Sequence, residues 1–369
     1  MKEEDLFYTL ALTKVNGVGP IIGKRLIENF GTAKKVFKAS TQELLIKRVS
    51  GQVTKQLQEK DNLIWAEKEL KQMQKSHIQP LFYQEEKYPY YLHQCDDAPI
   101  ILFYKGIGLP DWKSRPIVSL VGTRTPTTRG LAFCKQFMEV VQPFNPIVIS
   151  GLAYGIDACI HREALAFGLE TYGILGHGLQ RIYPANHRKL ANEMMEQGGV
   201  LTEFATQRKI ERENFIQRNR IVAGMSQATV VVESAMKGGS MSSVTFANEY
   251  NRDVFAVPGR VDDLMSQGCN ELIRTHRAQL LQDPREIIDV LNWNKVKTKV
   301  RLIQPELFLN LSEEEQRIYD YLNLVGRAVL DLIAMECNLP IYKVSTLLLQ
   351  LELQGLVKPL PGKYYECMG

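Results

Sequence analysis

The residues best suited to chemistry begin with Arg124, which follows the apolar, β-branched run Ile117–Val121. That run predicts a buried strand, and a helix is predicted over residues 128–141. A strand, a turn at Gly122 and Thr123, and a helix N-terminus together present backbone N–H groups that bind anions. Arg124 adds a planar fork of donors that fits phosphate oxygens. The segment therefore predicts a phosphate site, and the alternative is an ordinary turn with a surface arginine.

Four more segments of small, hydroxyl-bearing or basic residues follow later predicted strands or open later predicted helices. They are Ser150–Asp157, Gly176–Gly178 with Tyr183–Asn186, Phe215–Arg220, and Lys237–Ser240. Small residues let a phosphate approach the backbone, and two of these segments open helices. Arg218 and Arg220 supply charge, and Phe215 or Tyr183 is suited to stack on a base. The candidate binding residues are Gly122, Thr123, Arg124, Ser150, Gly151, Phe215, Arg218, Asn219, Arg220, Lys237, Gly238, Gly239 and Ser240.

These segments need a scaffold, and the middle of the chain alternates predicted strands with predicted helices. After an earlier strand at Ile100–Tyr104, the strands are Ile117–Val121, Ile147–Ser150, Thr171–Leu175, Val200–Phe204, Thr229–Glu233 and Val254–Val257. Such strand–helix–strand units form right-handed crossovers and a mostly parallel, doubly wound sheet. Sites in these α/β sheets lie at the carboxyl ends of the strands, where all five segments fall. We therefore expect a Rossmann-like domain over residues 81–292.

The side-chain groupings typical of enzymes are missing from the sequence. It contains no G-x-S-x-G elbow and no Walker A lysine, and His161 and His177 have no metal-ligand partners at the usual spacing. Asp157 and Glu233 are better suited to hold turns and N–H donors than to act as an acid–base pair. We therefore expect no metal, no cofactor and no catalytic activity.

Residues 1–80 predict an all-α domain with a positive charge, because they hold 14 Lys and Arg residues against 9 Asp and Glu. Helices are predicted at Leu6–Val15, Ile21–Asn29, Thr32–Lys38, Thr41–Lys47 and Thr54–Met73. The turn Asn16–Pro20 between the first two has the helix-hairpin-helix pattern of SAM-like domains. In such hairpins N–H groups and a nearby lysine, here Lys24, hold a DNA phosphate. The alternative is a packing domain whose turn is merely tight.

The last part of the chain predicts a linker at residues 293–310 and a winged helix at residues 311–369. The winged helix consists of helices Glu313–Leu322, Ala328–Glu336 and Ile341–Gln354, followed by a two-stranded hairpin of residues 355–358 and 363–365. Its third helix is rich in leucine and has one Lys and one Glu, whereas a helix that reads DNA bases needs several polar side chains. Protein contact or simple packing is therefore favoured for this domain.

Composition and charge place the protein in a broad class. The net charge is +4, no apolar run approaches the ~20 residues that span a bilayer, and no signal peptide opens the chain. The six cysteines are scattered without a C-x-x-C pair, which favours reduced thiols. We expect a cytoplasmic protein that does not interact with membranes.

In chain order, VSLVGTRTPT, ISGLAYGIDACIH, LGHGLQRIYPANH, NFIQRNRIVAGMSQATVVVE, and KGGSMSS followed by VFAVPG resemble the motifs of the DNA-processing protein A family (DprA, also called Smf). The match covers residues 81–281. It implies an extended Rossmann-like domain that binds single-stranded DNA through the candidate residues and dimerises. It also implies that the protein protects incoming DNA and loads RecA recombinase during natural transformation.

Two positions depart from the family pattern. Gly238 stands where relatives usually have serine, which removes one hydroxyl donor to phosphate. The stretch 266–278 ends in His276-Arg277-Ala278 instead of Gly-Ala.

Two enzyme classes are the alternatives to a DNA-binding protein. One is a nucleotide-binding phosphoribohydrolase of the lysine-decarboxylase-like Rossmann group, but the segment 235–241 lacks the Pro and third Gly of its P-G-G-x-G-T-x-x-E motif. The other is a dinucleotide enzyme, which Arg124 disfavours because it occupies the position of the second Gly in G-x-G-x-x-G.

Overall fold

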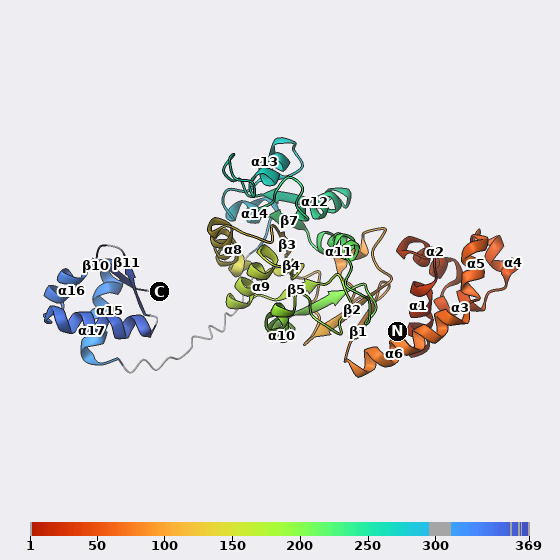
Figure 1. Cartoon of the computed structure of the whole chain (residues 1–369), viewed down its shortest axis with the longest axis horizontal. Coiled ribbons are helices and arrows are strands. Elements are labelled where there is room, and N and C mark those ends of the chain that lie inside the picture. The colour runs from red at the N-terminus through yellow and green to blue at the C-terminus, as the bar shows by residue number, and fades with distance from the viewer. Residues whose placement is uncertain (1, 295–310, 355, 361, 363, 368–369) are drawn as a thin grey trace. The chain divides into compact units, whose positions relative to one another are not determined.

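The computed structural model of the chain describes residues 2–294, 311–354, 356–360, 362 and 364–367. They fall into two compact units, Met1–Lys297 and Thr298–Gly369 (Figure 1). Residues 295–310, most of the predicted linker, lie outside the described residues. The division of the first unit into domains at residues 1–80 and 81–292 stays a prediction.

One nine-stranded sheet dominates the first unit, in the order β1-β2-β6-β5-β4-β3-β7-β8-β9. The strands are β1 Gln79–Phe82, β2 Ile101–Gly106, β3 Ile117–Val121, β4 Ile147–Ser150, β5 Thr171–Ile174, β6 Gly199–Thr202, β7 Ala228–Val231, β8 Asp253–Ala256 and β9 Gln279–Leu280. From β6 to β9 all neighbours pair in parallel, whereas β1 and β2 add an antiparallel edge. The predicted α/β, Rossmann-like sheet is confirmed; the short edge strands β1 and β9 were not predicted.

The helices between the parallel strands lie on both faces of the sheet. They are α8 Thr128–Val141, α9 Ile156–Ala166, α10 Arg188–Gln197, α11 Arg212–Gly224 and α12 Ser240–Glu249, with α7 Tyr90–His93, α13 Gln267–Arg274, α14 Arg285–Val290 and the 3-10 turns η1 Gln142–Phe144 and η2 Ala185–His187 in other connections. The chain moves from β3 through β4 and β5 to β6, then crosses back to β7 and β8. Right-handed crossovers therefore place α8–α10 on one face and α11 and α12 on the other (Figure 1). This reversal beside β3 opens a crevice at the carboxyl ends of β3 and β7.

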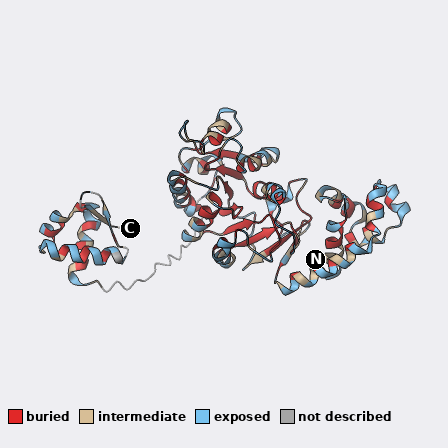
Figure 2. Ribbon diagram, in the orientation of Figure 1, coloured by how far each residue is buried: buried red, intermediate tan, exposed pale blue. Residues whose placement is uncertain are grey.

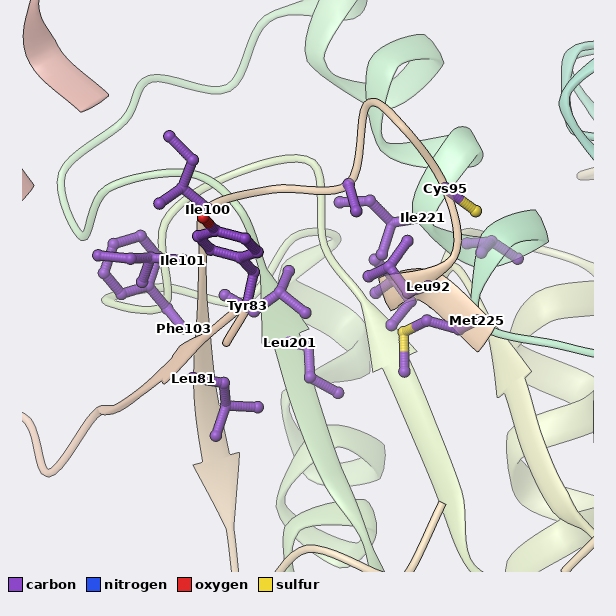
Figure 3. Packing of buried hydrophobic residues seen from close by; sticks show 14 of the residues in the cluster. Leu81, Tyr83, Leu92, Cys95, Ile100, Ile101, Phe103, Leu201, Ile221 and Met225 are labelled. Atoms are coloured by element: carbon purple, nitrogen blue, oxygen red, sulfur yellow. The ribbon is translucent and has the colours of Figure 1, made fainter. Parts of the chain in front are cut away.

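The sheet is covered so completely that every residue of β3 to β7 is buried (Figure 2). That burial explains why these strands are continuous apolar runs in the sequence. Figure 3 shows part of the larger core cluster, with Leu81 from β1, Ile101 from β2 and Ile221 from α11. The same cluster includes Leu10 of the first helix, so the N-terminal helices share a core with the sheet.

Residues 3–75 are mainly helical, as predicted, although several helix bounds differ by one to three residues and one predicted helix is two. The helices are α1 Glu3–Lys14, α2 Pro20–Phe30, α3 Ala33–Lys38, α4 Thr41–Ile46, α5 Gly51–Leu57 and α6 Lys60–Lys75. The single helix predicted over Thr54–Met73 is two helices, because the Asn62 side chain donates to the carbonyl oxygen of Gln56 at 2.8 Å and caps the end of α5. Lys24 differs from its predicted role. Its ammonium donates to the carbonyl oxygens of Cys95 and Asp96 at 3.2 and 3.0 Å, so it is engaged within the chain.

At the end of the first unit, the structure corrects the predicted start of the linker. Trp293, where the linker was predicted to begin, is buried, and its indole N–H donates to Gln227 Oε1 at 3.2 Å. His276, at the departure from the family pattern, has a φ of 56°, a left-handed conformation that glycine adopts more easily. The turn after α13 therefore forms even though the glycine of the family pattern is absent.

The second unit is a winged helix, as predicted, but its sheet has three strands. Its elements are α15 Glu313–Val325, β10 Arg327–Val329, α16 Leu330–Glu336, α17 Ile341–Leu353, β11 Val357–Leu360 and β12 Tyr364–Cys367. Ala328, predicted to open a helix, is paired with Tyr365 in β10. Lys343, the lysine of α17, pairs with Glu314 at 2.6 Å, and the exposed residues of this helix include Tyr342 and Leu349. The preference of this domain for protein contact over base reading stays a prediction.

Two further sequence expectations concern membranes and cysteines. Among the described residues no single helix is long and apolar enough to cross a bilayer, and only the bent pair Leu330–Glu336 and Ile341–Glu352 meets the length and composition test together. All six cysteines are free thiols.

Candidate functional site

A cleft of 770 Å³ opens at the carboxyl ends of β3 and β7, where the sheet topology predicts a site. The loops after β3 to β8, the first two turns of α11 and the start of α12 form its walls. From the sequence-predicted set, the residues that line it are Gly122, Thr123, Arg124, Tyr183, Phe215, Arg218, Asn219, Lys237, Gly238, Gly239 and Ser240. The structure therefore brings residues from separate motifs together in one cleft.

The loop that carries Arg124 is fixed by the backbone. Thr123 N–H donates to the Glu233 carbonyl oxygen at 2.7 Å, and Ile156 N–H donates to the Thr123 carbonyl oxygen at 3.1 Å. Gly155 has a φ of 80°, and a Cβ there would lie 2.2 Å from that same Thr123 oxygen, so only glycine fits beneath the loop. The Arg124 side chain is exposed and has no hydrogen bond or ion pair to any described residue. It is a cation on a fixed loop, and its guanidinium is free to take a ligand.

Arg218 is the unusual residue of the cleft, since it is buried without a full set of partners. Only 5% of it is exposed, and its Nε has no hydrogen-bond partner among the described residues. Burial lowers the pKa of Arg218, Asp157 raises it and Arg124 lowers it further, although the guanidinium stays charged. No salt bridge to Asp157 forms, and burial raises the pKa of that carboxyl. A buried charge that faces a cleft with unused donors is suited to bind an anion.

Gly151 lies directly behind this guanidinium, which gives a testable consequence. A Cβ at Gly151 would come within 1.6 Å of Arg218 Nη1, the far end of a flexible side chain. Gly151→Ala is therefore expected to displace the guanidinium and cost about 1–3 kcal/mol of binding free energy for a phosphate ligand. Melting should change little. Gly51→Ala, where a Cβ meets nothing within 4 Å, is the matched control. Unchanged affinity in Gly151→Ala would show that Arg218 does not act from this position.

The opposite wall is the segment that opens α12. Asn219 donates from Nδ2 to the Gly239 carbonyl oxygen at 3.3 Å and to Ser242 Oγ at 2.8 Å, which ties α11 to this segment. Lys237 is exposed and has no described partner. A Cβ at Gly238 would lie 2.4 Å from Ser234 Oγ, which accepts a hydrogen bond from Ser240 at 2.7 Å. The glycine at this departure from the family pattern thus leaves room for the serine pair.

Two aromatic rings stand at the edge of the cleft. The centroids of Tyr183 and Phe215 are 5.8 Å apart with a tilt of 53°, and Tyr183 is 46% exposed. Phe215 packs over Gly176, where a Cβ would lie 2.9 Å from its ring. An exposed ring beside cations can stack on a base while the backbone of the ligand meets the arginines.

Three predicted binding residues lie outside the cleft. Ser150 is fully buried and donates to the Leu120 carbonyl oxygen at 2.6 Å, and Gly151 acts only as the support of Arg218 described above. Arg220 was predicted to supply charge to the site, which the structure contradicts. Its guanidinium donates to the Asp97 carbonyl oxygen at 2.6 Å and pairs with the buried Glu203, so it holds loops of the sheet together.

The sequence reading missed Arg212, which lines the cleft together with Ile210, Ile216 and Met265. Arg212 opens α11, three residues before Phe215, and is exposed with no described partner. The sequence could have indicated Arg212, because residues three apart on a helix share a face and Phe215 was already a candidate.

The candidate acid–base residues have structural partners. Glu233 accepts from Thr127 N–H at 2.9 Å and from Thr127 Oγ1 at 2.5 Å, which anchors the start of α8. Asp157 accepts from Ala153 N–H at 3.3 Å within its own turn. Among the residues that the structure describes, no group of three His, Cys, Asp or Glu side chains is placed to hold a metal ion.

His161 is buried and uncharged, and this makes stability depend on pH. Thr171 Oγ1 donates to the Val148 carbonyl oxygen, so His161 Nδ1–H donates to Thr171 Oγ1 at 2.7 Å and Nε2 has no partner. Burial lowers the pKa of His161 to about 3 from 6.5. In this range the unfolded chain binds a proton that the folded chain does not, so stability falls as pH falls.

The loss should approach 1.4 kcal/mol per pH unit from this group. Denaturant unfolding of the wild type and of His161→Gln across pH 6.5 to 4 measures it. The substitution is expected to flatten the profile, and parallel profiles would contradict this account.

Family models, a relative and solved structures match most of this chain. A family model described as DNA recombination-mediator protein A matches residues 79–292, and a DprA winged helix domain model matches residues 306–363. Protein Smf of Synechocystis sp. is 32% identical, over 99% of this chain and 100% of that protein. The X-ray structure of DNA processing protein A from Streptococcus pneumoniae aligns with a TM-score of 0.56 at 26% identity, over 74% of this chain and 98% of that chain.

A second solved structure is DNA processing protein A from Helicobacter pylori, described for its single-stranded DNA binding mode. It aligns with a TM-score of 0.52 at 26% identity, over 59% of this chain and 97% of that chain. The family model, the full-length relative and the shared fold agree. The chain belongs to the DNA recombination-mediator protein A (DprA/Smf) family.

Proposed function

We propose that this chain binds single-stranded DNA by its phosphate backbone in the cleft after β3 and β7. The observation that carries the proposal is Arg218, a buried guanidinium that faces the cleft without a salt bridge. Arg124, Arg212 and Lys237 add three exposed cations without described partners at the same cleft. A series of cations matches a repeated phosphate better than a single small anion.

The preference for a single strand follows from the rings at the rim. Tyr183 and Phe215 offer faces for unstacked bases, which a duplex keeps inside its stack. Contacts to phosphate and to the faces of bases carry no sequence code, so we expect little base preference. The described single-stranded DNA binding mode of the Helicobacter pylori relative is consistent with this proposal.

Family membership supports the broader role. We propose that the chain acts in the cytoplasm on incoming single-stranded DNA during natural transformation, protects it and loads RecA recombinase, as a homodimer formed through the Rossmann-like domain. We further propose that it acts without catalysis, since Glu233 and Asp157 are engaged in holding loops and the buried His161 is uncharged at neutral pH. The phosphoribohydrolase alternative remains disfavoured because the segment 235–241 lacks the Pro and third Gly of its motif.

Competition binding tests the proposal. A labelled oligo-dT should be displaced by unlabelled single strands and far less well by duplex of equal length. Affinity should fall steeply with salt, with a slope of about −0.7 per phosphate contact. Thermal shift with nucleoside monophosphates serves as the control for the enzyme alternative. Equal displacement by duplex, or stabilisation by a mononucleotide with product release, would overturn the proposal.

A further inference from the structure

A second hollow of 690 Å³ adjoins the cleft, because Glu211 lines both. Its floor includes Ile101 and Phe103, alternate residues of β2 that lie on the same side of the strand (Figure 3). Its walls come from the end of α1, the middle of α6 and the loop 204–211 after β6. We refer to this hollow as the α6 groove.

Buried hydrogen bonds hold the walls of the α6 groove together. Glu69 of α6 accepts from Thr206 N–H at 2.6 Å and from Thr206 Oγ1 at 2.9 Å. Both residues are buried. The loop is therefore fixed to the helix, and the groove keeps its shape without a ligand.

Among the charged side chains that line the α6 groove, the carboxylates have partners within the chain and two of the lysines do not. Each carboxylate has a partner inside the chain: Glu69 holds Thr206, Glu203 pairs with Arg220, and Glu211 pairs with Arg208 at 2.8 Å. By contrast, the exposed Lys68 and Lys209 have no partner among the described residues. The groove thus presents unused positive charge.

An aromatic ring lies among these lysines. Lys14 Nζ lies 5.7 Å from the centroid of the partly buried Trp65 ring, and both residues line the groove. Proteins that hold single strands combine a basic groove with rings on which bases stack. This pairing points to a nucleic acid strand rather than to a small apolar ligand.

We propose that the α6 groove holds the continuation of the single strand that occupies the cleft, with phosphates on Lys14, Lys68 and Lys209 and a base on Trp65. The proposal rests on the proposed function of the cleft. It extends the DNA path onto the N-terminal helices, although Lys24 of the predicted hairpin is engaged elsewhere. The chain should therefore bind long strands more tightly than strands that fill only the cleft.

The experiment compares oligo-dT of about 6 and about 20 nucleotides, lengths that bracket one short site and a longer path. The full-length wild type is compared with Lys14→Ala/Lys68→Ala and with Lys60→Ala/Lys75→Ala. The latter pair is the matched control, since both lysines are exposed on α6 but lie outside the groove. Loss of the two groove lysines should weaken the long oligomer roughly tenfold and reduce its salt slope by about 1.4, with the short oligomer unchanged.

Tryptophan emission gives a second readout. The protein has three tryptophans, and Trp112 and Trp293 are buried at 2% and 7% exposure. Quenching by the long oligomer, absent with the short one and lost in Trp65→Phe, is the expected result.

The outcomes separate the two proposals. If the short oligomer binds through Arg218 but the groove variant matches the wild type at both lengths, the α6 groove is overturned and the cleft stands. A loss that is equal at both lengths, or equal in the control variant, also overturns the groove. If the wild type binds neither oligomer, the function proposed for the cleft fails.

Discussion

Replacing Arg218 by methionine is expected to cause the largest single loss of single-stranded DNA affinity, about 2–5 kcal/mol of binding free energy. Arg218 is buried at 5% exposure and lies against Gly151, so its position is set before the ligand arrives. A phosphate that meets it is held by a charge in a poorly solvated site, where the interaction is stronger than at the surface. Fluorescence anisotropy with a labelled oligo-dT measures the loss.

The rival explanation of Arg218 is that it only compensates Asp157. In that case Arg218→Met would lower the melting temperature sharply, because a buried carboxylate would lose its nearest countercharge, and affinity would follow folding. The double variant Arg218→Met/Asp157→Asn removes both charges and is the control. Our account predicts that this variant folds like the wild type and still binds weakly. Recovery of wild-type affinity in the double variant would contradict it.

Replacing Arg124 by alanine is expected to cost about 1–3 kcal/mol of binding free energy, the second largest effect. The guanidinium is exposed, has no described partner and extends from a loop fixed by Thr123 and Gly155. Arg124→Lys should recover only part of the affinity, because an ammonium cannot contact two oxygens with a planar fork. Titration of oligo-dT against each variant, with a melting curve for each, measures this.

A solvated surface arginine predicts the opposite pattern for these variants. Wild-type affinity in both, with unchanged melting, would remove Arg124 from the site. Because the side chain packs in no core cluster, the fold should be unaffected in either case.

The sheet and most of the residues that line the cleft could be predicted because their signals are local. The strand Ile117–Val121 was predicted with the bounds that it has, since a buried parallel strand is a continuous apolar run ended by glycine. Arg124 follows that strand, so the prediction of the strand also predicted that Arg124 lies at the carboxyl edge of the sheet. The edge strands β1 and β9 carry no such run, and β9 has only two residues, both exposed.

The errors came from contacts between distant parts of the chain. Arg218 and Arg220 were both assigned to the site, but residues two apart on a helix point in different directions, and Arg220 meets Asp97 and Glu203 instead. The hairpin motif led to the prediction that Lys24 binds DNA. In the structure its ammonium donates to the carbonyl oxygens of Cys95 and Asp96, about seventy positions away. That Arg218 would be buried without a salt bridge was likewise beyond any local pattern.

The most direct test of the cleft as the DNA site is photocrosslinking of the full-length wild type to oligo-dT that carries 5-iodouracil at each position in turn. Iodouracil reacts with a ring on which it stacks, so mass spectrometry of the adducts shows where bases lie. We expect adducts on Tyr183 or Phe215, the rings at the rim of the cleft. Adducts confined to the winged helix, for example at the exposed Tyr342, with none at the cleft, would contradict the account.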